Sequence, residues 1–256
     1  MTAQIRQFRC LDDNFGVLVH DPATGATAAI DVPEAAPVLA ELRSAGWTLT
    51  DILVTHRHKD HVGGIPEVLK SFPGARVHVP HAEAAQIEGP HLSVREGDVV
   101  KVGNLAARVI ETPGHTVGHI VYVFDADKLL FAGDTLFAMG CGRVFETPAD
   151  VMWTSLQKLA ALPPDTQVYC GHEYTLANGR FALTVEPQNE QLQKRVKEVE
   201  ALRAAGSFTL PTTIALELAT NPFLRAPNAT IRRNVGLQDA PDAAVFAEVR
   251  ERKNRG

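Results

Sequence analysis

The spacing of hydrophobic and polar positions changes near residue 174. Before that point, short apolar runs alternate with stretches in which apolar residues recur every three or four positions, spacings typical of β-strands and amphipathic helices, respectively. The pattern predicts strands at 15–20, 26–31, 51–55, 75–79, 166–170 and within 98–133, and helices at 35–45, 64–72 and 149–161. Interleaving of this kind predicts an α/β protein with buried sheets.

The region after residue 174 has a different, mostly helical pattern. Residues 186–205 have a strongly helical composition, and Gly206 is a suitable stop for that helix. Further helices are expected at 212–219 and 241–253, and the pattern predicts no strand there. We therefore predict two domains, residues 1–174 and residues 175–256.

The composition is that of an ordinary globular protein. The chain has 256 residues, of which 45% are hydrophobic and 21% charged, and it has no apolar run long enough to cross a bilayer. Its first residues lack the pattern of a signal peptide, so we expect a cytoplasmic protein. Three scattered cysteines, Cys10, Cys141 and Cys170, fit a reducing compartment as free, partly buried thiols.

The charge of the chain says little about large partners. The net charge is -5, and nothing resembles the basic stripe of a nucleic-acid-binding protein. The region after residue 174 is the more basic one, which suits either an anionic ligand or ordinary solvated helix faces. We expect no nucleic-acid or membrane partner, and a monomer.

A cluster of histidines and an aspartate follows the strand expected at 51–55. It reads THRHKDH at residues 55–61, and its candidate metal ligands are His56, His58, Asp60 and His61. Four ligands within six residues cannot all reach one tetrahedral ion from a regular strand or helix. A loop at a strand's end can direct them to two neighbouring ions. Nitrogen and oxygen donors suit Zn, and also Fe or Mn.

Three later residues extend this candidate set. His115, Asp134 and His172 each follow an apolar run, and α/β folds place their sites at such strand ends. Each alone is more often a cap, a turn residue or a core histidine, but together with the cluster they predict a metal centre. The other histidines are left unassigned, although His119 is a candidate neighbour of the ligands.

These residues resemble the metallo-β-lactamase superfamily, whose pattern is THxHxDH followed by a separate His, Asp and His. The resemblance covers residues 1 to about 174. It implies a four-layer αββα sandwich that holds one or two metals at the sheet edge. It does not identify the substrate, because this superfamily includes lactamases, thioesterases, lactonases, nucleases, dioxygenases and redox enzymes.

Other segments resemble the glyoxalase II family, the hydroxyacylglutathione hydrolases. They are LDDNFG (11–16), CGRVFE (141–146), GHEYT followed by NGRFA (171–182), NPFLR (221–225) and the basic end VRERKNRG (249–256). The resemblance implies hydrolysis of S-D-lactoylglutathione to D-lactate and glutathione. It also implies that the helical second domain binds the glutathione part of the substrate.

The family resemblance assigns roles to the ligands. His56, His58 and His115 would bind one metal, Asp60, His61 and His172 the other, and Asp134 would bridge both. We expect two divalent ions per chain, with Zn favoured over Fe or Mn. The implied mechanism is attack on the thioester by a hydroxide held between the metals, with Asp60 and Asp134 as the catalytic carboxylates.

The same resemblance assigns the substrate-binding residues. They are Arg143, Phe145, Tyr174, Arg250 and Lys253. Arg143 stands where many members of the family have Lys, and Phe145 stands where many have Tyr, so a hydroxyl contact to glutathione would be missing. For Arg250 and Lys253 the alternative is a frayed, solvated terminal helix.

Three other functions fit parts of the pattern. A persulfide dioxygenase with one iron shares much of the ligand set but does not need the helical region with NPFLR. A lactonase or another hydrolase of the same fold is a second alternative. A structural metal-binding module is a third, although structural zinc sites are usually closed and rich in thiolates.

Overall fold

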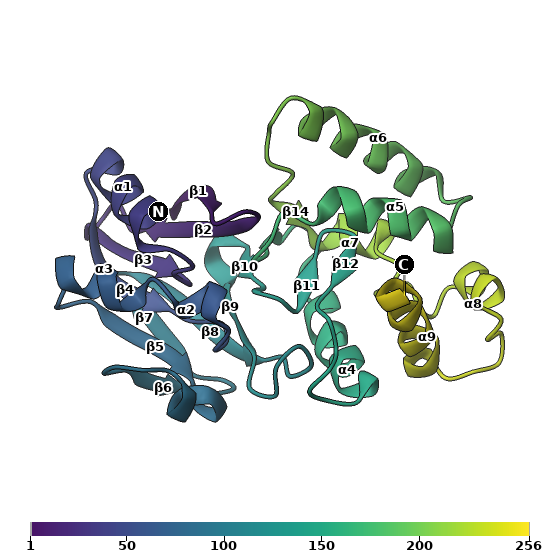
Figure 1. Cartoon of the computed structure of the whole chain (residues 1–256), viewed down its shortest axis with the longest axis horizontal. Coiled ribbons are helices and arrows are strands. Elements are labelled where there is room, and N and C mark those ends of the chain that lie inside the picture. Colours follow the sequence, from purple (N-terminus) through teal and green to yellow (C-terminus); the bar gives the residue numbers. More distant parts are fainter. Residues whose placement is uncertain (1, 256) are drawn as a thin grey trace. The chain divides into compact units, whose positions relative to one another are not determined.

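The computed structural model describes residues 2–255, which form two compact units. Unit 1 comprises Met1–Glu111 and Val117–Gly133, and unit 2 comprises Thr112–Thr116 and Asp134–Gly256. Figure 1 shows the elements of both units. The domain boundary after residue 174 stays a prediction, and the ends of the predicted domains, Met1 and Gly256, lie outside the described residues.

Unit 1 contains a six-stranded sheet with the order β1-β2-β3-β4-β5-β6. Its strands are β1 (Gln4–Cys10), β2 (Asn14–His20), β3 (Ala26–Ile30), β4 (Thr48–Leu53), β5 (Arg76–Pro80) and β6 (Leu92–Val94). The first three strands pair antiparallel, whereas β3 to β6 pair parallel. The carboxyl ends of the parallel strands therefore meet at one edge of this sheet.

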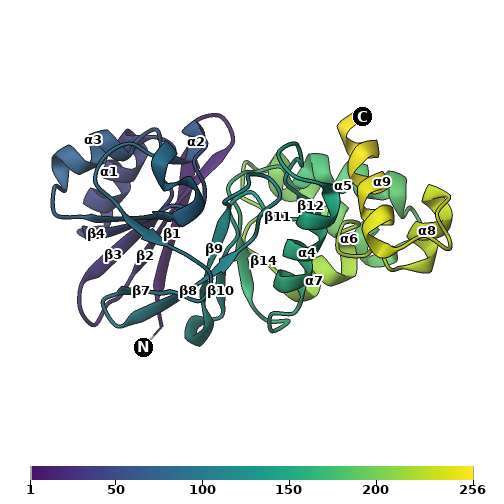
Figure 2. The same ribbon diagram turned by 90° about the horizontal axis from the view of Figure 1, so that it is seen from below.

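Helices cover one face of the six-stranded sheet. They are α1 (Ala35–Ala45), the short α2 (Lys59–Val62) and α3 (Ile65–Ser71). Val38 and Leu42 of α1 pack with Ile65 and Val68 of α3 against buried aliphatic residues of the strands. Figure 2 shows α1 and α3 on one side of this sheet and strands β7 and β8 on the other.

A second, antiparallel set of strands in unit 1 lies against the opposite face. It consists of β7 (Val99–Val102), β8 (Leu105–Glu111), β9 (Ile120–Phe124) and β10 (Leu129–Phe131). Two 3₁₀ turns, η1 (His81–Gln86) and η2 (Asp125–Asp127), complete the unit. The buried Tyr122 of β9 donates a hydrogen bond to the carbonyl of Val54, 3.0 Å away, and so joins the two sheets.

Unit 2 is mostly helical. Its helices are α4 (Ala149–Ala160), α5 (Thr175–Val185), α6 (Glu190–Ala204), α7 (Ile214–Thr220), α8 (Ala229–Val235) and α9 (Asp242–Arg255). Two short pairs of strands accompany them: the hairpin β11 (Leu136–Phe137) and β12 (Gly140–Cys141), and β13 (Gln167–Tyr169) with β14 (Thr212–Thr213). Helices α5 and α6 pack against each other, and α4 packs against α9.

Most of the predicted elements are confirmed. The helix predicted at 35–45 has those bounds and ends at Gly46 in the left-handed conformation. The strands expected at 15–20, 26–31 and 75–79 agree with β2, β3 and β5 to within a residue. The three cysteines are free thiols, as predicted, and all three are buried. No helix among residues 2–255 is long and apolar enough to cross a membrane.

After residue 174, two predicted helices begin later than expected, and the expectation that this region contains no strand is wrong. The helix predicted from 186 begins at Glu190, because Asn189 caps it by accepting a hydrogen bond from the backbone of Leu192. The segment predicted as helix from 212 starts with the strand β14, although no strand was expected there. Helices α5 and α8 were not predicted, and neither was β1 in unit 1.

Candidate metal centre

Unit 1 carries the THRHKDH cluster on the loop and short helix after β4. Because β3 and β4 are parallel neighbours, Asp31, the residue after β3, lies beside this loop. Its carboxylate accepts hydrogen bonds from the backbone and the hydroxyl of Thr55, at 2.7 and 2.8 Å. The Nδ1 atom of His61 lies 2.8 Å from the same carboxylate, so Nε2 of His61 is the atom that is left to bind a metal ion.

The histidines of this cluster lie as close together as ligands of one ion do. Nε2 of His56 is 3.1 Å from Nδ1 of His58. Two nitrogens that each bind a tetrahedral zinc ion at its usual distance are about 3.3 Å apart. Ligand atoms of His61 lie within 4.8 Å of those of His56 and Asp60. His56 and His61 are buried, whereas His58 and Asp60 are partly exposed.

Residues outside the cluster hold its backbone and its aspartate. The side-chain amide of Asn14 donates to the carbonyl and to the carboxylate of Asp60, at 3.0 and 3.2 Å. The fully buried Glu83 of η1 accepts from the backbone amides of Arg57, at 2.6 Å, and Gly118, at 3.1 Å. The loop between His56 and His58 is therefore fixed through its own backbone.

His119, the candidate neighbour of the ligands, lies where it was expected. It is fully buried, and its ring stacks on that of His56 with the ring centroids 4.9 Å apart.

Unit 2 carries the other three candidate ligands. His115 follows β8 in the chain, Asp134 follows β10 and His172 follows β13. The carboxylate Oδ2 of Asp134 lies 3.5 Å from Nε2 of His115 and 3.3 Å from Nε2 of His172. These separations equal those between neighbouring ligands of a metal ion, and all three residues are buried. Nδ1 of His115 lies 3.1 Å from the carbonyl of Arg143, which leaves Nε2 to act as the ligand.

The donors in each unit fit a divalent metal ion. Imidazole nitrogens and carboxylate oxygens are ligands of Zn, Fe and Mn. The thiols do not belong to this set. Burial, followed by the charge of Glu34, raises the pKa of Cys10 to about 12, and burial raises the pKa of Cys170 as well. The groups of candidate ligands among residues 2–255 contain no cysteine.

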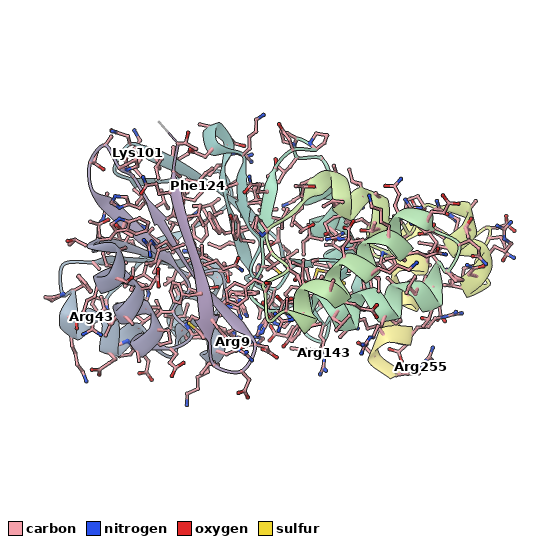
Figure 3. The ribbon with its side chains drawn as sticks, turned by 90° about the horizontal axis from the view of Figure 1, so that it is seen from above. Arg9, Arg43, Lys101, Phe124, Arg143 and Arg255 are labelled. Atoms are coloured by element: carbon pink, nitrogen blue, oxygen red, sulfur yellow. The ribbon has the colours of Figure 1, made fainter. Side chains whose placement is uncertain are left out.

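The predicted substrate residues lie in unit 2, which also holds His115, Asp134 and His172. The ring of Tyr174 stacks on that of His172, with centroids 4.7 Å apart and planes 4° from parallel. Phe145 makes an edge contact with His115 at 5.4 Å, and it is 60% exposed. Arg143 is exposed as well (Figure 3). Rings that contact the candidate ligands and remain open to solvent are suited to contact a bound molecule.

The two basic residues of α9 differ from each other. Arg250 is buried, donates to the carbonyl of Cys141 at 3.0 Å and lies over the ring of Phe223. Lys253 is half-buried, with its ammonium group 5.0 Å from the centre of the Phe181 ring. Burial, followed by the charge of Arg250, lowers the pKa of Lys253. The alternative of a frayed, solvated terminal helix is therefore wrong.

Sequence models of two protein families match the chain. The metallo-β-lactamase superfamily matches residues 11–172, and the C-terminus of hydroxyacylglutathione hydrolase matches residues 173–256. A hydroxyacylglutathione hydrolase from Rhodopseudomonas palustris is 59% identical over 256 residues, and the match covers 100% of both chains. This chain belongs to the hydroxyacylglutathione hydrolase family. Another hydroxyacylglutathione hydrolase, from Nitrobacter winogradskyi, is 55% identical, again over 100% of both chains.

Solved structures show the same fold. ETHE1 from Myxococcus xanthus is 27% identical, with a TM-score of 0.66 over 99% of each chain. The B3 metallo-β-lactamase BLEG-1 is 22% identical, also with a TM-score of 0.66, and covers 86% of this chain and 99% of its own. The predicted fold class, a metallo-β-lactamase fold with a helical C-terminal domain, is confirmed, and so is the resemblance to the glyoxalase II family.

Proposed function

We propose that this chain is a metal-dependent thioester hydrolase that converts S-D-lactoylglutathione to D-lactate and glutathione. The observation that carries the proposal is the contact of His115 with Phe145 and of His172 with Tyr174. Candidate metal ligands and candidate substrate residues thus meet within one compact unit of a chain whose relatives are named hydroxyacylglutathione hydrolases.

We propose two zinc ions per chain. His56, His58 and His115 would hold one ion, Asp60, His61 and His172 the other, and Asp134 would be shared. The spacing of ligand atoms within each unit supports this assignment. When bound, the ions supply a water of lowered pKa and a positive charge for the thioester carbonyl.

The surrounding groups favour the tautomers in which Nε2 of His61 and Nε2 of His115 can act as ligands. Asp31 accepts the proton on Nδ1 of His61, and the carbonyl of Arg143 accepts the one on Nδ1 of His115, so both Nε2 atoms keep a lone pair. Asn14 holds the carboxylate of Asp60, which can then orient a water molecule. The leaving thiolate has an ordinary pKa of about 8.5, so it departs without a general acid.

The glutathione part of the substrate has two carboxylates, and unit 2 offers basic groups for them. Arg143 and Lys253 would bind carboxylates, with Arg143 able to form two parallel hydrogen bonds. Phe145 and Tyr174 would pack against the apolar parts of the tripeptide. Arg250 would add positive charge to this region, and its guanidinium group also donates to the carbonyl of Cys141.

The proposal is tested by following the loss of thioester absorbance when purified protein is added to S-D-lactoylglutathione. We expect fast turnover that a chelator abolishes and that zinc restores. A metal-replete sample without turnover would refute the proposal. Oxygen uptake with glutathione persulfide, together with one iron per chain, would instead establish the dioxygenase alternative.

We also propose that the protein is a cytoplasmic monomer. Free thiols at Cys10, Cys141 and Cys170 fit a reducing compartment. Light scattering during size-exclusion chromatography measures the mass directly, and a value well above the 27.7 kDa of one chain would refute the monomer.

A further inference from the structure

The β11–β12 hairpin connects two parts of the proposed site. It begins two residues after Asp134 and ends two residues before Arg143. At the open end of the hairpin, opposite its turn, the amide of Gly142 donates to the carbonyl of Thr135, and a side chain at Gly142 would collide with the carbonyl of Asp134. The carbonyl of Arg143 in turn binds Nδ1 of His115. The position of this hairpin therefore sets two candidate ligands and one substrate residue.

The hairpin is too short to be stable in this position by itself. It pairs only Leu136 with Cys141 and Phe137 with Gly140, and a pair of two-residue strands has little stability of its own. Its turn residue Met139 has a left-handed backbone with φ of 54°, which is unfavourable for a residue other than glycine. Some other part of the fold must stabilise this conformation.

Four buried polar side chains from helices of unit 2, or from the residue after one, bind the backbone of the hairpin. We call them the hairpin cradle: Asn178, Glu217, Asn221 and Arg250. Glu217 accepts from the amide of Met139 at 2.8 Å, and Asn178 donates to the carbonyl of Ala138 at 3.1 Å.

Asn221 and Arg250 complete the cradle. Asn221 donates to the carbonyls of Phe137 and Gly140, at 3.1 and 2.9 Å, and Arg250 donates to the carbonyl of Cys141 at 3.0 Å. Every residue from Phe137 to Cys141 is thus bound through its backbone. The side chain of Met139 is also enclosed, by apolar residues of α5 and α6.

The cradle is itself held by a buried ion pair. Arg195 of α6 donates to Glu217 at 2.6 Å, and the hydroxyl of Thr212 donates to the same oxygen at 2.7 Å. The other oxygen of Glu217 accepts from Asn221 as well as from Met139. Asn221 is the first residue of the NPFLR segment, and its side chain donates both to the backbone of the hairpin and to Glu217.

We propose that the hairpin cradle is a positioning device for the metal centre, in which Asn221 and Glu217 fix the hairpin so that Asp134 and His115 are correctly placed. The proposal rests on the proposed role of these two residues as metal ligands. It gives the C-terminal helices a second task besides binding glutathione. Removing a side chain that holds a metal ligand in place typically weakens metal binding by about 10- to 100-fold.

The test compares Asn221→Ala with a matched control, Asn189→Ala. Asn189, at the start of α6, also donates to a glutamate and to a backbone carbonyl and accepts from a backbone amide, but none of these three partners belongs to the hairpin. Two quantities are measured on the full chain: the dissociation constant for Zn²⁺, by competition with a chromogenic chelator, and hydrogen exchange at the amide of Met139.

We expect Asn221→Ala to bind Zn²⁺ about tenfold more weakly and to exchange the Met139 amide faster, with neither change in Asn189→Ala. Equal zinc affinity and equal exchange in the two variants would overturn the proposal. If Asn221→Ala does not fold, Asn178→Ala removes a single donor and should shift both quantities in the same direction. Neither readout involves the thioester, so failure of the proposed activity is seen separately, in the wild-type assay.

Discussion

The two halves of the proposed metal centre are built in different ways, although the candidate ligands of both are histidine and aspartate side chains. In unit 1, four candidate ligands lie within residues 56–61, on the loop and the short helix α2 after one strand. In unit 2, three ligands come from segments as far apart as His115 and His172. The first half needs only its loop to be held, which Asp31 and Glu83 do. The second half needs a whole arrangement of helices around the β11–β12 hairpin.

Because of this difference, substitutions should affect the two halves in different ways. The loop of unit 1 depends on a few buried carboxylates beside it, so a change at one of them should act on the candidate ligands of that loop and not on the substrate residues, which lie in unit 2. The hairpin of unit 2 depends on side chains that also join helices to each other. A change there should affect the metal, the substrate residues and the stability of the fold together.

The largest effect is expected for Asp134→Ala, which removes the carboxylate that unit 2 places between His115 and His172. Loss of a ligand should exceed the effect of losing a ligand's partner, so we expect more than about a 100-fold drop in zinc affinity and turnover. Zinc content by mass spectrometry and the thioester assay measure both. The helical circular dichroism should stay unchanged, and full turnover would exclude Asp134 as a shared ligand.

The next effect concerns unit 1 and compares Asp31→Asn with Asp51→Asn. Both aspartates are buried, and each binds a histidine and a threonine hydroxyl. Only the histidine bound to Asp31, His61, is a candidate ligand, so Asp31→Asn should weaken zinc binding about 10- to 100-fold. Asp51→Asn should leave zinc affinity unchanged while lowering the melting temperature.

The outcome that would contradict this comparison is an equal effect of the two substitutions on zinc affinity. It would mean that general destabilisation of the six-stranded sheet, rather than the orientation of His61, controls the metal. Thermal unfolding of the metal-free proteins provides the control, because it reports the loss of stability without the metal.

The contrast between the halves also explains what could be predicted from the sequence. The cluster at residues 56–61 is visible because its members are neighbours in the chain, and His115, Asp134 and His172 each follow an apolar run. Asp31 was missed, because its role arises only when β3 pairs with β4 in the parallel sheet. Its signal was present: it is an aspartate that follows an apolar run, as Asp134 does.

The helical region shows a further reason for incomplete prediction. Helix α1 was predicted because apolar residues and Gly46 lie at regular helical positions. Helix α5 has no such regular pattern, since buried Asn178 and Gly179 face the hairpin, and Gly179 packs against Met139. Buried polar groups are selected by their distant partners rather than by local periodicity, so the cradle was not visible in the sequence.

A smaller effect separates the two basic residues of α9. Lys253→Met should raise the KM for the glutathione thioester several-fold, because it removes a charge that we propose binds the glutathione part of the substrate. Arg250→Met should lower kcat by up to about tenfold as well, because Arg250 also binds the carbonyl of Cys141 in the hairpin. Steady-state kinetics of both variants measure the split. A pure KM effect of Arg250→Met would mean that its bond to Cys141 does not position the site.

The smallest expected effect is a pH dependence that arises from Lys253. Burial and the neighbouring charges of Arg250 and Arg143 lower the pKa of Lys253 below its ordinary value of 10.5. A lowered lysine pKa means that the positive charge is present at neutral pH and is lost as the pH rises through that lowered value. We therefore expect the KM of the wild type to increase at alkaline pH, beginning below 10.5.

Lys253→Arg is the matched variant for this measurement, because arginine keeps its charge at every pH used. The amino group of glutathione also titrates in the alkaline range, but it does so equally with both proteins. The ratio of the two KM values isolates Lys253, once spontaneous hydrolysis has been subtracted. A ratio that stays constant with pH would show that the charge of Lys253 does not act on the substrate. The glutathione carboxylates would then depend on Arg143, the exposed basic residue next to the hairpin of unit 2.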